Sequence, residues 1–217
     1  MNIELARNNM IEQQLRPWQV SDAKVLHLFA AVKREDFVPL AHKSLAFAEL
    51  EIPLPGGQCM LEPCIEARLL QDLAVKPHET VLEIGTGSGF MTALLAHFAH
   101  RVVSLEIVPE LATMARSNLR NAGIQNAEVR QADGSNVAAA EGTYDAILLG
   151  GSVAEVPASL LNLLKVGGRL SAIVGDDPVM RATTVTRTSG TEFKTVQSWD
   201  AVVPRLQNFP EPVRFKF

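Results

Sequence analysis

The chain has 217 residues, of which 47% are hydrophobic and 20% charged, and its formal net charge at pH 7 is −4. A chain of this length and composition is expected to form one soluble globular domain with its own core. It has no basic tract and no apolar run near the length of about 20 residues that spans a bilayer, so we expect neither a nucleic-acid partner nor a membrane span.

The first 76 residues are predicted to be helical, with a loop inserted. Apolar residues at helical spacing predict one helix over 3–15 and a second that begins after Ser21-Asp22 and closes at 36–39. The apolar residues in 40–57 follow neither helical nor strand spacing, and prolines and glycines interrupt the segment, which indicates an ordered loop. Glu62-Pro63 then opens a helix that runs to about Val75. The N-terminal residues lack the apolar core of a signal peptide, so we expect a cytoplasmic location.

From Thr80 onward, β-type and helical segments alternate. Strands are predicted over 81–84, 101–106, 127–131, 144–149 and 169–175, with helices over 89–99, 109–121, 135–139 and 157–164. This alternation predicts an α/β fold with a Rossmann-like, doubly wound and mostly parallel sheet over 77–206, and ligands at the carboxyl ends of its strands. Residues 182–188 and 192–203 are predicted to form a hairpin at the sheet edge, followed by a tail over 207–217.

The stretch from Thr80 to Met91, T-V-L-E-I-G-T-G-S-G-F-M, predicts a strand, a glycine-rich turn and a helix start. In a dinucleotide-binding G-x-G-x-x-G fingerprint, the third glycine would stand where this chain has Phe90. The spacing is instead E-x-G-x-G-x-G, beginning at Glu83. Glycine tolerates positive φ and admits a ligand close to the backbone, and a helix N-terminus offers free N–H groups. The turn is therefore expected to hold a polar ligand.

Two further acids follow the next two predicted strands. Glu106 ends the second strand, where a carboxylate can accept both hydroxyls of a ribose, and Asp133-Gly134 follows the third, near an adenine edge. Together with the glycine motif, this arrangement resembles motif I and its neighbours in the Rossmann-like S-adenosylmethionine (SAM) methyltransferases. The resemblance implies a class I methyltransferase fold with SAM as the cofactor.

A narrower resemblance covers about residues 7–206: the chain is similar to the protein-L-isoaspartate O-methyltransferase family. The matching segments are Gln14-Leu15, Val25-Leu26, Val32 to Pro39, Ala46-Phe47, Pro53, Gly57-Gln58, Pro63, Val81 to Gly89, Asp133-Gly134, Tyr144 to Ile147, Glu155 to Pro157 and Leu164 to Leu170. The resemblance implies a single methyltransferase domain over 1–217 that transfers methyl to the carboxylate of L-isoaspartyl residues in damaged proteins. It further implies a protein or peptide substrate and a monomer or homodimer.

The loop before the Pro63 helix departs from the family. Where members typically read Gly-Gln-Thr-Ile-Ser, this chain reads Gly57-Gln58-Cys59-Met60-Leu61, so Leu61 replaces the serine assigned to substrate handling. A lost hydroxyl contact costs about 1–3 kcal/mol, whereas alignment of reacting groups can supply roughly 7–11 kcal/mol. The change alone therefore does not remove the mechanism. Two alternatives stay open: a different, more hydrophobic or small-molecule acceptor, and a SAM-binding protein without turnover.

The resemblance assigns residues to both halves of the site. Gln58, Cys59 and Leu61 are the expected catalytic loop residues, with Glu49 and the segment Gly150 to Ser152 completing the substrate pocket. The expected cofactor-binding residues are Glu83, Gly85, Thr86, Gly87, Ser88, Gly89, Glu106, Ile107, Asp133, Gly134 and Gly150. We expect no metal site, because Cys59 and Cys64 supply only two of the roughly four ligands that zinc needs.

Overall fold

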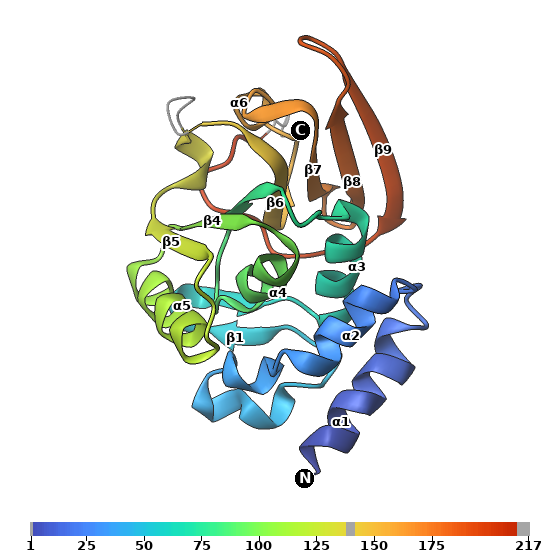
Figure 1. The fold of residues 1–217 in the computed structure, drawn as a ribbon, viewed down its shortest axis with the longest axis vertical. Helices are drawn as coiled ribbons and strands as arrows, with labels where there is room; N and C mark the ends of the chain where they lie inside the picture. Colours follow the sequence, from blue (N-terminus) through green and yellow to red (C-terminus); the bar gives the residue numbers. More distant parts are fainter. Residues whose placement is uncertain (1, 138–141, 212–217) are drawn as a thin grey trace, which may run out of the picture.

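The computed structural model describes residues 2–137 and 142–211 (Figure 1). Its centre is a seven-stranded sheet in the order β5-β4-β3-β6-β7-β8-β9. The strands are β3 (Thr80–Ile84), β4 (Arg101–Glu106), β5 (Ala127–Gln131), β6 (Tyr144–Val153), β7 (Leu164–Asp176), β8 (Val179–Arg187) and β9 (Phe193–Asp200). The first five pair in parallel, and β8 and β9 add to the edge in antiparallel orientation. The predicted doubly wound sheet and its edge hairpin are confirmed.

Both faces of the central strands are buried, which is why their sequences are almost continuously apolar. Successive side chains of a strand point to opposite faces. Val81 accordingly belongs to the core on one face, whereas Leu82 and Ile84 belong to the core on the other. The sheet therefore separates two hydrophobic cores.

Three helices cover the first face: α3 (Pro63–Leu73), α4 (Phe90–Phe98) and α5 (Pro109–Asn121) (Figure 1). Two N-terminal helices, α1 (Ile3–Met10) and α2 (Ala23–Ala31), pack outside this layer. The second face is covered by the short α6 (Ala158–Leu161) and by C-terminal residues that include Leu206 and Phe209. None of the helices within the described ranges is long and apolar enough to cross a bilayer.

Several predicted boundaries are wrong. The predicted first helix divides into α1 and a π-helical turn, Ile11–Leu15. The predicted loop over 40–57 contains a strand, β1 (Ile52–Leu54), which pairs with β2 (Gln58–Met60) across Gly56 and Gly57, both at positive φ. Each of these strands has three residues, too few for the alternation of buried and exposed residues to be recognised in the sequence. The predicted helix over 157–164 is reduced to α6, because β7 already begins at Leu164.

Two predictions reach outside the described residues. The helix expected over 135–139 is a 3-10 turn, Gly134–Asn136, and its last predicted residues fall in the range 138–141. The predicted tail is described only as far as residue 211.

Candidate active site

The candidate site lies where the strand order reverses, between β3 and β6. In open α/β sheets, ligands bind outside the carboxyl ends of the strands at this switch point. The register pairs Ile84 with Leu149, so Gly85, just after β3, lies beside Gly150 within β6. Gly85 has a φ of +90°, and a Cβ on Gly150 would lie 2.6 Å from the Gly85 carbonyl oxygen. Glycine at position 150 is therefore required for β6 to lie so close to the turn that follows β3.

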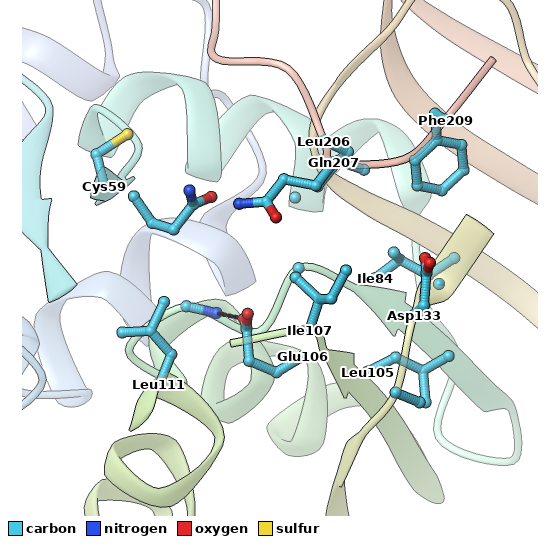
Figure 2. Close-up of a pocket in the computed structure, with 16 residues that line it drawn as sticks. Cys59, Ile84, Leu105, Glu106, Ile107, Leu111, Asp133, Leu206, Gln207 and Phe209 are labelled. Atoms are coloured by element: carbon cyan, nitrogen blue, oxygen red, sulfur yellow. Dashed lines mark hydrogen bonds between the residues drawn. The ribbon is translucent and has the colours of Figure 1, made fainter. Parts of the chain in front are cut away.

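A cavity opens at this point, with the strand ends on one side and a C-terminal segment on the other (Figure 2). Glu106, Ile107 and Asp133 lie on the strand side, and Leu206, Gln207 and Phe209 lie across from them. The remaining lining residues are Gln58, Cys59, Ile84, Gly85, Gly87, Leu105, Leu111, Ala132, Gly134 and Gly150. Most of the predicted cofactor residues thus share one cavity.

Glu106 is held at the end of β4 by backbone donors. Its Oε2 accepts the Gly87 N–H at 2.8 Å and its Oε1 accepts the Val108 N–H at 2.9 Å. Burial raises the pKa of Glu106, and these backbone hydrogen bonds oppose the rise. The carboxylate therefore ties the glycine turn to β4 while its remaining lone pairs face the cavity, as a pair of ribose hydroxyls requires.

Asp133 follows β5 and faces the same cavity. Burial alone would raise the pKa of Asp133, but hydrogen bonds from Ser135, Asn208 and Asn136 together hold it below its usual value. The side chain is thus an ionised acceptor at neutral pH. Gly134 after it cannot carry a side chain, because a Cβ there would lie 2.2 Å from Cγ2 of Ile84.

A second, smaller cavity continues from the first and has a volume of about 30 Å³. The two cavities share Cys59, Gly85, Gly87 and Gly150 as lining residues. The small cavity is otherwise lined by Met60, Leu61, Glu66, Leu69, Thr86, Ser88, Met91 and Leu148. It therefore joins the glycine turn to the divergent loop.

Two residues of the glycine motif that were predicted to bind the cofactor line neither cavity, and each makes structural contacts. Glu83 is fully buried behind the turn, lines neither cavity, and accepts hydrogen bonds from the hydroxyls of Thr92 and Ser104. Burial raises the pKa of Glu83 to about 7. Gly89 lines neither cavity, and a Cβ there would lie 3.2–3.3 Å from atoms of Ala115. Glu83 thus joins β3 to α4 and β4, and Gly89 allows α4 to pack on α5.

Two residues predicted for the substrate pocket also lie elsewhere. Glu49 accepts a hydrogen bond from the indole N–H of Trp18 at 2.9 Å and lines neither cavity. Ser152 is buried and donates its hydroxyl to the carbonyl of Val203 at 2.9 Å, so it binds the C-terminal segment instead of an acceptor.

The predicted catalytic loop residues do reach the cavities. Gln58 lines the large cavity, Leu61 lines the small one, and Cys59 lines both. Burial and the neighbouring Glu51 raise the pKa of the Cys59 thiol to about 12, so this group stays protonated and cannot serve as a base. Cys59 and Cys64 are both free thiols, and no three potential metal ligands cluster among the residues described.

Part of the wall opposite the strands is a C-terminal segment that was not among the predicted site residues. Residues 203–209, which we call the covering segment, are held on β6 by paired backbone hydrogen bonds with Ser152, and Asn208 reaches Asp133 at 2.9 Å. Phe209 packs in the core on the second face of the sheet and also lines the large cavity. Glu66, one helical turn into α3, lines the small cavity and was also missed.

Comparison with known proteins gives a consistent result. The sequence pattern of the protein-L-isoaspartate(D-aspartate) O-methyltransferase family matches residues 5–203. A protein-L-isoaspartate O-methyltransferase of Koribacter versatilis is 35% identical over 204 residues, which is 94% of this chain and 92% of the relative. One from Methanoculleus marisnigri is 40% identical over 169 residues, covering 78% of this chain and 77% of the relative.

The fold also matches a solved structure. A Plasmodium falciparum structure described as a protein-L-isoaspartate O-methyltransferase, in complex with S-adenosyl-L-homocysteine, superimposes with a TM-score of 0.81. The match covers 95% of this chain and 99% of that one, at 21% identity. At this identity the likeness concerns the fold alone.

Proposed function

The chain belongs to the protein-L-isoaspartate(D-aspartate) O-methyltransferase family, and we propose that it methylates the carboxylate of L-isoaspartyl residues in proteins or peptides, using SAM. The observation that supports this most strongly is the cavity at the switch point. It brings Glu106, Asp133 and the glycine turn together, as a nucleoside with a polar tail requires.

The residues present suit SAM. Glu106 would accept the ribose hydroxyls, Asp133 would face the adenine, and the turn at Gly85 and Gly87 would lie against the methionine part. The P. falciparum structure of the same fold was solved with the demethylated product, which supports the same ligand here. When bound, SAM supplies an electrophilic methyl group on its sulfonium.

The protein has to position the carboxylate that accepts the methyl group, but it does not have to activate it. An isoaspartyl carboxylate has a free pKa of about 4 and is ionised at neutral pH, so no general base is needed. This agrees with the protonated state of the Cys59 thiol, which lines both cavities. The covering segment and the loop at Met60 and Leu61 present apolar groups that exclude water and hold the reacting atoms in line.

Location and assembly follow as parts of the same proposal. The two free cysteines suit the reducing cytoplasm, where we propose that the protein acts as a monomer or homodimer.

The test is transfer of labelled methyl from SAM to an isoaspartyl peptide, beside its aspartyl twin, with the wild type and the Leu61→Ser variant in parallel. Turnover on the isoaspartyl peptide alone supports the proposal. Turnover only in Leu61→Ser would mean that the loop has been adapted to another acceptor. If neither protein turns over although S-adenosylhomocysteine binds, the isoaspartyl assignment is wrong.

A further inference from the structure

Glu66 is a buried acid for which the proposed chemistry has no use. It lies on α3 with only 5% of its surface exposed, yet its side chain lines the small cavity beside the glycine turn. A carboxylate removed from water is costly unless it is paired and hydrogen-bonded. Its position therefore calls for a partner.

Arg34 satisfies one side of this carboxylate. Its Nε and Nη2 both donate to Oε2 of Glu66, each at 3.3 Å, which is long for a charged pair. The same guanidinium makes shorter bonds to the carbonyls of Ala46 and Leu61, at 2.8 and 2.7 Å. Among the described residues, Oε1 of Glu66 accepts no hydrogen bond. Arg34 is thus well satisfied by the backbone, whereas one oxygen of Glu66 remains available.

The cavity beside Glu66 is small enough to define what it can hold. Its volume of about 30 Å³ exceeds the roughly 10–15 Å³ that one buried water needs. It can therefore hold an ammonium group but not a ring. Its other walls are the glycine turn, the loop at residues 59–61 and the apolar side chains of Leu69, Met91 and Leu148.

The order of the acids along the cleft identifies which end of the cofactor reaches this point. Asp133 and Glu106 line the large cavity, and the small cavity begins beyond Gly85 and Gly87. A nucleoside seated on the two acids therefore directs its amino-acid tail toward Glu66. That tail ends in an α-ammonium and an α-carboxylate, of which only the ammonium is attracted by an acid.

We propose that Glu66 is a cofactor-binding residue whose carboxylate receives the α-ammonium group of the methionine end of SAM. This inference rests on the proposed use of SAM, but not on the identity of the methyl acceptor. Glu66 would act as the third acid of the cleft, after Asp133 at the adenine and Glu106 at the ribose.

The charges around Glu66 link this contact to pH. The groups that face it are Arg34 from the 3-10 turn Arg34–Asp36, Cys59 from β2 and Glu83 from β3. Burial raises the pKa of Glu66 to about 7, and Arg34 opposes the rise. A bound ammonium favours the ionised form, so cofactor binding near neutral pH releases a proton from Glu66.

The test is calorimetric binding of S-adenosylhomocysteine, compared with 5′-methylthioadenosine, which keeps the nucleoside but lacks the amino-acid tail. In Glu66→Gln we expect the affinity for S-adenosylhomocysteine to fall roughly 10- to 100-fold, the range for a charged hydrogen bond. The affinity for methylthioadenosine should stay unchanged. Glu110→Gln, at an exposed acid on α5, is the matched control and should change neither.

The wild type supplies a second measurement that does not depend on folding of the variant. Calorimetry at pH 7 in buffers of different ionisation enthalpy should show proton release on binding of S-adenosylhomocysteine and none with methylthioadenosine. Equal loss of both ligands in Glu66→Gln, or no proton release in the wild type, would overturn the proposal and leave Glu66 as a structural partner of Arg34. Failure of the wild type to bind S-adenosylhomocysteine would instead overturn the proposed function itself.

Discussion

The two walls of the cleft differ in how the chain builds them. The strand wall, with Gly85, Glu106 and Asp133, comes from consecutive βα units of the sheet. The covering wall brings the β1–β2 hairpin together with residues 203–209, from near the opposite end of the chain. The strand wall presents the glycine turn and two carboxylates, whereas the covering wall presents apolar side chains together with the side-chain amides of Gln58 and Gln207. Cofactor recognition should therefore depend mainly on the first wall, and closure of the cleft on the second.

The largest effect is expected at Glu106. Glu106→Ala removes the ribose acceptor and leaves the partly buried N–H groups of Gly87 and Val108 without their partner. The affinity for S-adenosylhomocysteine should fall at least roughly 100-fold, or about 2.8 kcal/mol at 1.4 kcal/mol per tenfold. Isothermal calorimetry measures it, with Glu110→Ala as the control. A loss below tenfold would mean that the strand wall does not carry recognition.

Gly150→Ala tests the close approach of β6 to the turn that follows β3. The added Cβ would lie 2.6 Å from the carbonyl oxygen of Gly85, a backbone atom that can yield only by moving the turn. We expect a loss of about 1–3 kcal/mol in the free energy of unfolding, as for other overpacked interiors. Gly190→Ala, where a Cβ meets nothing within 4 Å, is the matched control. Equal urea midpoints for the two variants would contradict the geometry.

Glu83→Gln tests whether Glu83 stabilises the fold behind the glycine turn, through the pH dependence of the free energy of unfolding. Burial raises the pKa of Glu83 from 4.5 to about 7, so its protonated form stabilises the fold and this contribution is lost as pH rises through that range. The wild type should lose about 1–3 kcal/mol more than Glu83→Gln between pH 5 and 8, because one pKa unit is worth about 1.36 kcal/mol. Urea unfolding at both pH values measures this difference. An identical pH dependence would show that Glu83 does not titrate in this range.

The smallest effect is expected at the contact between the walls. Asn208→Ala removes the hydrogen bond from the covering segment to Asp133. Because one such bond contributes about 0.5–1.5 kcal/mol, S-adenosylhomocysteine should bind about three- to tenfold more weakly, chiefly through faster dissociation. Stopped-flow displacement measures the dissociation rate, and Asn162→Ala at an exposed position is the control. An unchanged rate would mean that the covering segment does not retain the ligand through this contact.

The same contrast explains which residues could be predicted from the sequence. Glu106 and Asp133 were predicted because each follows its strand directly, and parallel strands end at the same edge. The glycine turn was predicted as a unit, but its sequence does not say that Glu83 turns inward or that Gly89 meets Ala115. A motif gives the type of turn, whereas the packing of each side chain depends on neighbours from other elements.

The C-terminal part of the covering wall was not assigned to the site from the sequence, for a physical reason. Residues 203–209 have no periodicity. They are held at the site by paired backbone bonds with Ser152, near the end of β6, and by side-chain bonds from Arg205 and Asn208. Glu66 looks like an ordinary helical acid until the fold places Arg34 and the glycine turn around it. Such contacts join distant parts of the chain, and no local pattern encodes them.

The most direct measurement is amide hydrogen exchange with and without S-adenosylhomocysteine. The account predicts slower exchange in both walls: in residues 85–89 and 106–108 of the strand wall, and in residues 58–61 and 203–209 of the covering wall. The exposed hairpin around residues 188–192 should not change. Protection confined to the strand wall would contradict the account, because the ligand would then bind without the covering segment closing over it.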